Sequence, residues 1–154
     1  MAKQRHKITP ASYLILEKDN KILLLRRFNT GYEDGKYSMV AGHVDKGETF
    51  TECIIREAKE EAGIILKPEN LKVVHVMNRD SSQGVENEEN ERVDIFFTAE
   101  NWGGEIKNKE SNKCDDLSWF SLNNIPNNTI DYVSFAIENY KNKVFYSEFG
   151  YSDK

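Results

Sequence analysis

Three glutamates lie on one face of a predicted helix, at positions 57, 60 and 61. Glu57, Glu60 and Glu61 continue a stripe whose first half, at residues 50, 53 and 54, is apolar. Carboxylates at this spacing repel each other by about 0.2–0.5 kcal/mol per pair, and the helix dipole disfavours anions near a C-terminus. A divalent cation offsets both penalties, and Mg²⁺ is commonly held by a few carboxylates together with substrate phosphates. The spacing therefore predicts a metal site for phosphate chemistry.

An arginine and a further glutamate flank this cluster. Arg56 lies four residues before Glu60 and four after Glu52, so it can brace carboxylates on its side of the helix. The alternative is an ordinary surface ion pair, which contributes little. Glu48 precedes the helix, where it either serves as a favoured charge at the N-terminus or reaches Arg56 and orients its side chain.

The helix that carries these residues has clear start and stop signals. Residues 49–62 have apolar residues at helical spacing, and Thr49 with Glu52 forms a capping box. Gly63 follows where a C-terminal cap is expected. A helix over residues 49–62 is therefore predicted.

The other elements predict one α/β or α+β domain. Two apolar runs, residues 13–16 and 22–25, flank a polar turn and predict a β-hairpin. The acidic insert at residues 80–91 is interpreted as a solvated loop, with a ligand-facing lid as the alternative. A mixed sheet covered by two helices, as one domain over residues 1–154, accounts for all elements. Further strands are predicted at residues 37–40, 71–77, 93–99 and 117–120, and a second helix from residue 129 to about 143.

The composition limits the partners. The 154 residues include 21 basic and 26 acidic ones, a net charge of −5, which argues against binding a nucleic-acid polymer through general backbone attraction. No apolar run reaches 18 residues, so no membrane helix is expected. Cys53 and Cys114 show no CxxC pattern and are interpreted as small apolar filler. With no apolar segment near the N-terminus, a reduced, cytoplasmic protein is expected.

The cluster is part of a longer motif. Gly42, five residues, Glu48, seven residues and then Arg56-Glu57-Ala58-Lys59-Glu60-Glu61-Ala62-Gly63-Ile64 resemble a complete Nudix box over residues 42–64. All seven fixed positions are filled, which makes the motif far more specific than a lone glycine pattern. The paired arginines at 26–27 and the run at 117–126 also resemble the MutT-like branch, so the resemblance covers residues 8–143 approximately.

The resemblance implies a fold and a reaction. Nudix proteins form an α/β/α sandwich in which the box makes a loop–helix–loop beside a mixed sheet. Most of them hydrolyse a nucleoside diphosphate linked to another group, using Mg²⁺ or Mn²⁺ to promote attack of water on phosphorus. By this likeness Glu60 and Glu61 are the main metal ligands, and Glu57 is a further ligand or the base that orients water. A backbone carbonyl at Ala41 or Gly42 would complete the metal shell.

The likeness also assigns supporting residues. Arg56 and Glu48 resemble the family's bracing pair. Many relatives use another carboxylate on a later loop as metal ligand or general base, and Glu110 is the candidate here. A solvated-loop role is the alternative for Glu110, and its rivals are Glu88, Glu89 and Glu91.

Four residues are candidates for substrate contact. Arg27 ends a predicted strand where MutT-like relatives contact substrate phosphate, and Arg26 lies on the opposite face of that strand. The alternative for both is a plain exposed strand end. Asn127 and Asn128 fall where relatives read the edge of the base, although asparagine equally suits turns.

Two aromatic residues have alternative roles, and one segment departs from the family pattern. Tyr32 and Trp119 could stack on a base or pack, and packing is favoured for Trp119. Many pyrophosphohydrolases have Pro-Gly before the box glycine, where this chain has Val40-Ala41.

The main functional hypothesis is a nucleoside triphosphate pyrophosphohydrolase that releases the monophosphate and pyrophosphate. Hydrolysis of ADP-ribose or a nucleotide sugar is the alternative within the class. A nucleotide-sensing module without turnover is the alternative from another class, and a purely structural acidic domain is a further one. The expected partner is a small nucleotide, and the fold would allow a homodimer.

Overall fold

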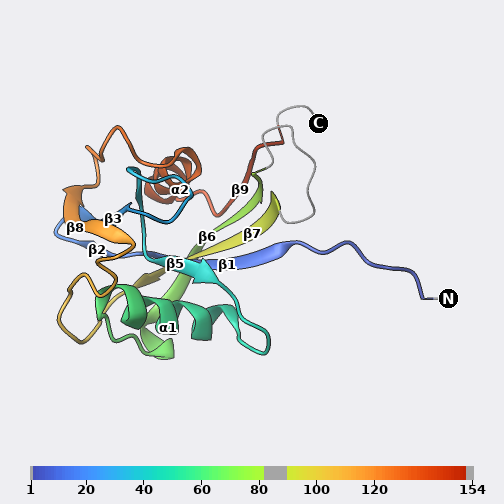
Figure 1. Cartoon of the computed structure of the whole chain (residues 1–154), viewed down its shortest axis with the longest axis horizontal. Helices are drawn as coiled ribbons and strands as arrows, with labels where there is room; N and C mark the ends of the chain where they lie inside the picture. Colours follow the sequence, from blue (N-terminus) through green and yellow to red (C-terminus); the bar gives the residue numbers. More distant parts are fainter. Residues whose placement is uncertain (1, 82–89, 152–154) are drawn as a thin grey trace.

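Two β-sheets and two helices make up the molecule, arranged so that the helices lie on opposite sides (Figure 1). The structure is a computed structural model that describes residues 2–81 and 90–151. The larger sheet has the order β5-β1-β7-β6-β9 and contains parallel and antiparallel pairs. This confirms the mixed α+β fold with two covering helices. The elements are β1 Thr9–Ile15, β2 Glu17–Lys18, β3 Lys21–Arg27, β4 Tyr37–Ser38, β5 Ala41–His43, α1 Phe50–Ala62, the 3₁₀ turn Pro68–Asn70, β6 Leu71–Asp80, β7 Glu91–Ala99, β8 Cys114–Ser121, α2 Asp131–Lys141 and β9 Tyr146–Phe149.

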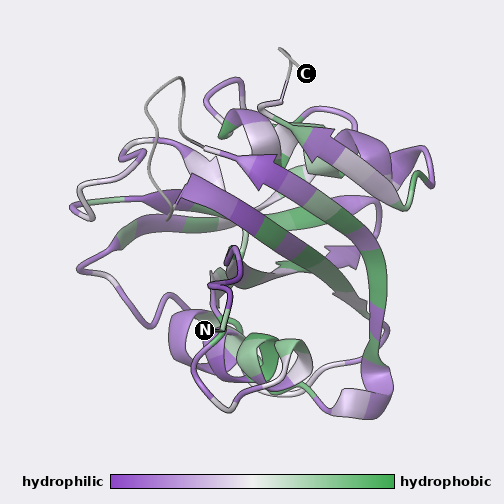
Figure 2. Ribbon diagram, turned by 90° about the vertical axis from the view of Figure 1, so that its right-hand side faces the viewer, coloured by the Kyte–Doolittle hydropathy of each residue, from purple (hydrophilic) through white to green (hydrophobic). Residues whose placement is uncertain are grey.

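Strand β1 is buried on both faces and separates two apolar cores. Because side chains alternate along a strand, Tyr13 and Ile15 pack into the core on the α2 side, while Leu14 and Leu16 join Ile54 in the core on the α1 side. Figure 2 shows apolar residues along the central strands and on the sheet-facing side of α1. Among the described residues, no helix is long and apolar enough to cross a bilayer.

Helix α1 begins and ends where the sequence predicts. The capping box is complete, because Glu52 N donates to Thr49 Oγ1 and Thr49 N donates to Glu52 Oε1, each at 3.0 Å. Gly63 closes the helix in the left-handed region, with φ of 68°. The predicted helix is confirmed.

The predicted hairpin of residues 13–16 and 22–25 is confirmed only next to its turn. Glu17 and Lys18 pair with β3 and Leu23 N donates to Leu16 O at 3.1 Å, around a turn in which Asp19 and Asn20 have positive φ. The body of β1 instead pairs with β5 and β7 in the other sheet. A strand that is apolar on both faces is stabilised in the middle of a sheet that has a helix on each side. The apolar runs in the sequence do not show which strands β1 pairs with.

The single strand predicted at residues 37–40 is confirmed only for residues 37–38. The structure has two short strands, β4 in the smaller sheet and β5 in the larger, joined by the buried Met39 and Val40. Leu14 N donates to Val40 O at 2.9 Å, which ties this crossing to β1. The segment therefore connects the two sheets and leads directly into the strand that contains Gly42.

The C-terminal half adds a strand that the sequence analysis missed. Strand β9 runs parallel to β6, and the buried His75 joins them through Val144 O and Ser147 Oγ, each at 2.7 Å. Helix α2 is shorter than predicted at both ends. Strands β6 and β7 extend into the predicted acidic loop, pairing Asp80 with Glu91, whereas residues 82–89 lie outside the described residues.

Replacing Thr49 by alanine should destabilise the protein by about 1 kcal/mol, because it removes the side-chain half of the capping box. Urea unfolding followed by circular dichroism would measure the change in unfolding free energy. Thr51→Ala, inside the same helical turn, is the matched control and should leave stability unchanged or slightly raised. Equal losses in both variants would contradict the cap assignment.

Candidate active site

Helix α1 presents its glutamates beside β5. Ala58 and Ala62 are fully buried against the sheet, and this fixes the direction in which the intervening glutamates point. Gly42 on β5 makes the approach possible: a Cβ there would lie 2.2 Å from Cδ of Glu57. The box glycine is therefore required because the Glu57 side chain occupies its side-chain space.

Arg56 holds the flank of the cluster. Its Nε and Nη2 donate to the two oxygens of Glu48 at 2.7 and 3.0 Å, and its Nη1 donates to Glu57 Oε1 at 2.6 Å. A longer bond of 3.4 Å reaches Glu60, and Nη2 also donates to His43 O at 3.2 Å. The structure thus places the two residues of the expected bracing pair in a bidentate contact, the strongest geometry for such a pair.

Two of the carboxylates have raised pKa values. Burial raises the pKa of Glu61 well above its ordinary value, and the negative charges of Glu57 and Glu110 raise it further, although Ala41 N donates to Glu61 Oε1 at 3.0 Å. Burial also raises the pKa of Glu57 despite its contact with Arg56. These groups would be stabilised as carboxylates by a nearby cation.

The donor set fits a hard divalent cation. Glu57, Glu61 and Glu110 are close enough to repel each other, and they offer oxygen, the ligand that Mg²⁺ and Mn²⁺ prefer. Within residues 2–81 and 90–151, however, no three His, Cys, Asp or Glu side chains stand at metal-binding spacing. Arg56 donates to one oxygen of Glu57, and the Ala41 amide donates to one oxygen of Glu61. A cation would have to replace or share these partners.

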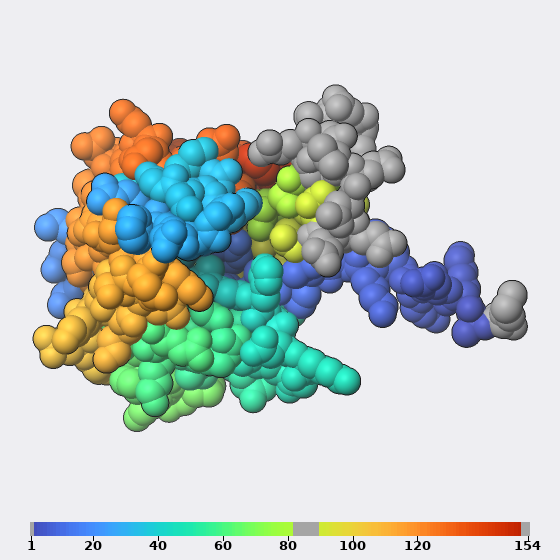
Figure 3. All heavy atoms as spheres, viewed as in Figure 1, coloured from blue at the N-terminus to red at the C-terminus, as the bar shows by residue number. Residues whose placement is uncertain are grey.

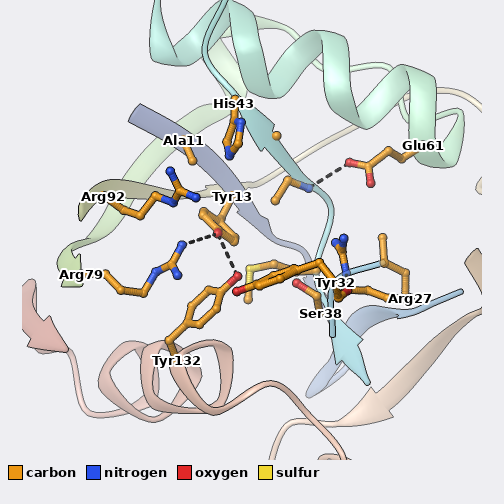
Figure 4. A pocket seen from close by; sticks show the side chains of 14 residues that line it. Ala11, Tyr13, Arg27, Tyr32, Ser38, His43, Glu61, Arg79, Arg92 and Tyr132 are labelled. Carbon is orange, nitrogen blue, oxygen red and sulfur yellow. Dashed lines mark hydrogen bonds between the residues drawn. The ribbon is translucent and has the colours of Figure 1, made fainter. Parts of the chain in front are cut away.

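A cavity of about 320 Å³ opens beside Glu61 (Figure 4). A second cavity of about 280 Å³ contains Glu110 and Lys113 and shares Arg27 and Glu61 with the first. The carboxylate end of the site therefore lies where two cavities meet. The first cavity is lined by Ala11, Tyr13, Leu25, Arg27, Tyr32, Ser38, Met39, Ala41, Gly42, His43, Glu61, Arg79, Arg92 and Tyr132.

The two predicted arginines have different surroundings. Arg27 lines both cavities; its Nε donates to Tyr32 O at 2.7 Å, and its guanidinium lies 5.3 Å from the centre of the Tyr32 ring. Arg26 points to the other face of β3, where it pairs with Asp115 at 2.7 Å. Figure 3 shows the surface loop of residues 28–36 in light blue beside residues 108–115 in orange, and Phe28 N donates to Lys113 O at 2.9 Å.

The predicted asparagines lie away from this cavity. Asn128 donates from Nδ2 to Gly35 O at 2.8 Å and thereby holds the 28–36 loop, while Asn127 is exposed. Trp119 packs on Trp102 with ring centres 6.4 Å apart, as favoured from the sequence.

The other carboxylates and the cysteines are also placed. Glu60 is half exposed on the outer side of α1. Glu91 pairs with His6, and Glu88 and Glu89 lie outside the described residues. Cys53 and Cys114 are free and buried, which agrees with their interpretation as filler.

The sequence analysis missed a group of residues at the far end of the cavity. Arg79 and Asp94 are almost fully buried and form an ion pair of 2.7 Å, and the Arg79 guanidinium lies 3.6 Å from the centre of the Tyr132 ring. Burial lowers the pKa of His43, and the charge of Arg92 lowers it further. The position of Arg79 in β6 could have indicated this group. Every second residue of this part of the strand is buried, and Arg79 falls on a buried position although its side chain is charged.

Replacing Glu48 by glutamine should destabilise the protein most at neutral pH. Hydrogen bonds from Arg56 and from Asp45 N lower the pKa of Glu48 from 4.5 to about 2. A lowered folded-state pKa stabilises the fold above the unfolded-state value and loses that effect as pH falls toward the folded-state value. The stability difference between wild type and Glu48→Gln should therefore shrink between pH 4.5 and about 2.

Urea titrations at several pH values would check this prediction. Glu69→Gln, at an exposed position away from the site, is the control and should show no such trend. A difference that stays constant down to pH 3, roughly midway through the titration range, would contradict the ion-pair assignment.

Known proteins resemble the chain in sequence. The NUDIX domain family matches residues 6–138. The chain is 37% identical over 119 residues to an ADP-ribose pyrophosphatase of Methanocaldococcus jannaschii, covering 77% of this chain and 64% of that protein. It is 30% identical over 120 residues to the NAD-capped RNA hydrolase NudC of Chromobacterium violaceum, covering 78% of this chain and 40% of that one. The chain thus spans between two fifths and two thirds of these relatives' lengths.

A solved structure shows the same architecture. The MutT NUDIX hydrolase from Burkholderia pseudomallei superposes with a TM-score of 0.75 at 25% identity, covering 86% of this chain and 97% of that one. The family match spans most of the chain, including the complete box and the carboxylate cluster. The chain belongs to the NUDIX domain family.

Proposed function

We propose that the protein is a divalent-metal-dependent pyrophosphohydrolase of nucleoside diphosphates linked to a second group. The observation that carries the proposal is the position of Glu61, which lines two adjoining cavities together with Arg27. Glu57 and Glu110 lie close enough to repel it, and Glu110 lines the second cavity. A diphosphate at this junction would meet the positive charge of Arg27. Residues 1–154 would form one domain.

The carboxylates would hold Mg²⁺ or Mn²⁺. Glu57 and Glu61 would supply ligands from inside the site, Glu60 from the exposed side of α1, and a carbonyl of Ala41 or Gly42 from β5. A bound metal neutralises the diphosphate and lowers the pKa of a bound water.

The protein residues would orient the nucleophilic water. Arg56 restrains Glu57 through Oε1, and the Glu57 carboxylate would accept a hydrogen bond from that water. Glu110, which lines the second cavity with Glu61, is the alternative proton acceptor. Glu48 would act only through Arg56 by fixing its guanidinium.

For the substrate we favour ADP-ribose or a compound of the same type. The relative with 37% identity is an ADP-ribose pyrophosphatase, and cavities on both sides of Glu61 suit a diphosphate with a bulky group at each end. A nucleoside triphosphate is the second candidate, because Lys113 and Arg27 in the second cavity would suit a pyrophosphate group.

A panel of ADP-ribose, nucleotide sugars and nucleoside triphosphates, assayed with Mg²⁺ and with product identification, tests the proposal. We expect AMP and ribose 5-phosphate from ADP-ribose, with activity lost in EDTA and restored by Mg²⁺ or Mn²⁺. Pyrophosphate release from a triphosphate, with ADP-ribose left intact, would favour the second candidate. Binding without turnover of any diphosphate at saturating metal would contradict the enzymatic proposal.

Glu61→Gln should lower kcat by at least about 100-fold, because an amide binds a hard cation far less well than a carboxylate. The same substitution should leave the unfolding free energy unchanged or raised, because it removes a charge that burial and Glu57 disfavour. Glu60→Gln should also lower kcat by orders of magnitude. Steady-state kinetics and thermal unfolding measure both effects, with Glu69→Gln as an exposed control. Wild-type turnover in Glu60→Gln or Glu61→Gln would remove the metal role of that residue.

A further inference from the structure

We infer that the end of the main cavity away from Glu61 binds a phosphate group attached to the sugar of the substrate, with Arg92 as its receptor. The inference rests on the proposed function for the position of the diphosphate. It narrows the substrate from ADP-ribose itself to a related diphosphate that carries a further phosphate on its sugar. Figure 4 shows Glu61 on one side of the cavity and Arg79, Arg92 and His43 on the other. The far end therefore carries the guanidiniums of Arg79 and Arg92, whereas the near end carries the Glu61 carboxylate.

Arg92 has no ion-pair partner within 4 Å among the described residues, although the charge of Asp94 acts on it from farther away. The Cα of Arg92 lies directly opposite that of Arg79 in the β6–β7 pair, and like charges at opposed positions destabilise a sheet. Asp94 neutralises Arg79 at 2.7 Å. Within the described part of the chain, the Arg92 side chain has no hydrogen bond or ion pair, so its guanidinium faces the cavity with free donors.

The neighbouring groups leave this end of the cavity positive. Two guanidiniums, those of Arg79 and Arg92, stand against one carboxylate, Asp94, and His43 faces them from β5. Asp94 is fully buried, and its Oδ1 has no hydrogen-bond partner among the described residues. A planar guanidinium with free donors best matches a phosphate, which it can bind through two parallel hydrogen bonds.

The sheet register separates this position from the diphosphate. Ala41, Tyr13 and Phe96 form one row across three strands, and Arg92 lies four residues before Phe96 on β7. Strand spacings place the Cα atoms of Ala41 and Arg92 roughly 16 Å apart. That separation leaves room for one sugar between phosphates held near Glu61 and a second anion at Arg92. The second anion is therefore assigned to the sugar, at its 2′ or 3′ oxygen for a nucleoside.

Calorimetric titration of the whole protein in Mg²⁺ with AMP, adenosine 2′,5′-bisphosphate and adenosine 3′,5′-bisphosphate tests the inference. At least one bisphosphate should bind about 10- to 100-fold more tightly than AMP, the effect of one charged bidentate contact. Arg92→Gln should abolish this gain and leave AMP binding unchanged, whereas Arg92→Lys should keep part of it. Lys72→Gln, which removes an exposed charge on β6, is the matched control and should behave as wild type.

Two results would overturn the inference: equal binding of AMP and both bisphosphates to the wild type, or equal weakening of all three ligands by Arg92→Gln. A titration with inorganic phosphate alone distinguishes a site for free phosphate from a site for a phosphate group on the substrate. Arg92-dependent binding of free phosphate as tight as that of the bisphosphates would assign the site to the free ion and contradict a substrate role. Because these titrations need no turnover, absence of hydrolysis would refute the proposed function without affecting this result.

Discussion

Repulsion between carboxylates at the C-terminal half of α1 is the constraint on which the site depends. Burial and mutual repulsion raise the pKa values of Glu57 and Glu61, and the helix dipole also disfavours negative charge at this end of α1. Arg56 compensates from one flank, held in turn by Glu48. The apolar face of α1 supplies the remaining stability, since Ile54, Ala58 and Ala62 are fully buried against the sheet. The helix can therefore carry an unfavourable charge pattern where a cation is expected.

The glutamates of α1 also determine which residues fit on β5. Gly42 leaves space that the Glu57 side chain fills, and the Ala41 amide donates to Glu61. This chain has Val40-Ala41 where many relatives have Pro-Gly, yet Val40 is buried and its carbonyl accepts from Leu14 N. Strand β1 thus positions β5 relative to α1, and β1 is held in place because both of its faces are buried.

The net charge of −5 conceals an uneven distribution. The Glu61 carboxylate, with Glu57 and Glu110 near it, lies at one end of the main cavity, and Arg79, Arg92 and His43 lie at the other. Only one of the two arginines has an acidic partner among the described residues. A charge gradient of this kind orients a ligand that is anionic at both ends, provided that a cation covers the carboxylates.

The sequence by itself determined the helix, its caps and the carboxylate spacing, because these depend on residues within one continuous segment whose periodicity and end signals are local. The contact of Arg56 with Glu48 was open from the sequence, since it needs the loop before α1 to fold back. Only the tertiary structure decided the far end of the cavity. Arg79, Arg92 and His43 come from three strands. The hairpin and the strand at residues 37–40 were predicted correctly only in part, next to the turn and at residues 37–38. Strand partners depend on pairing between distant segments, which local residue patterns do not encode.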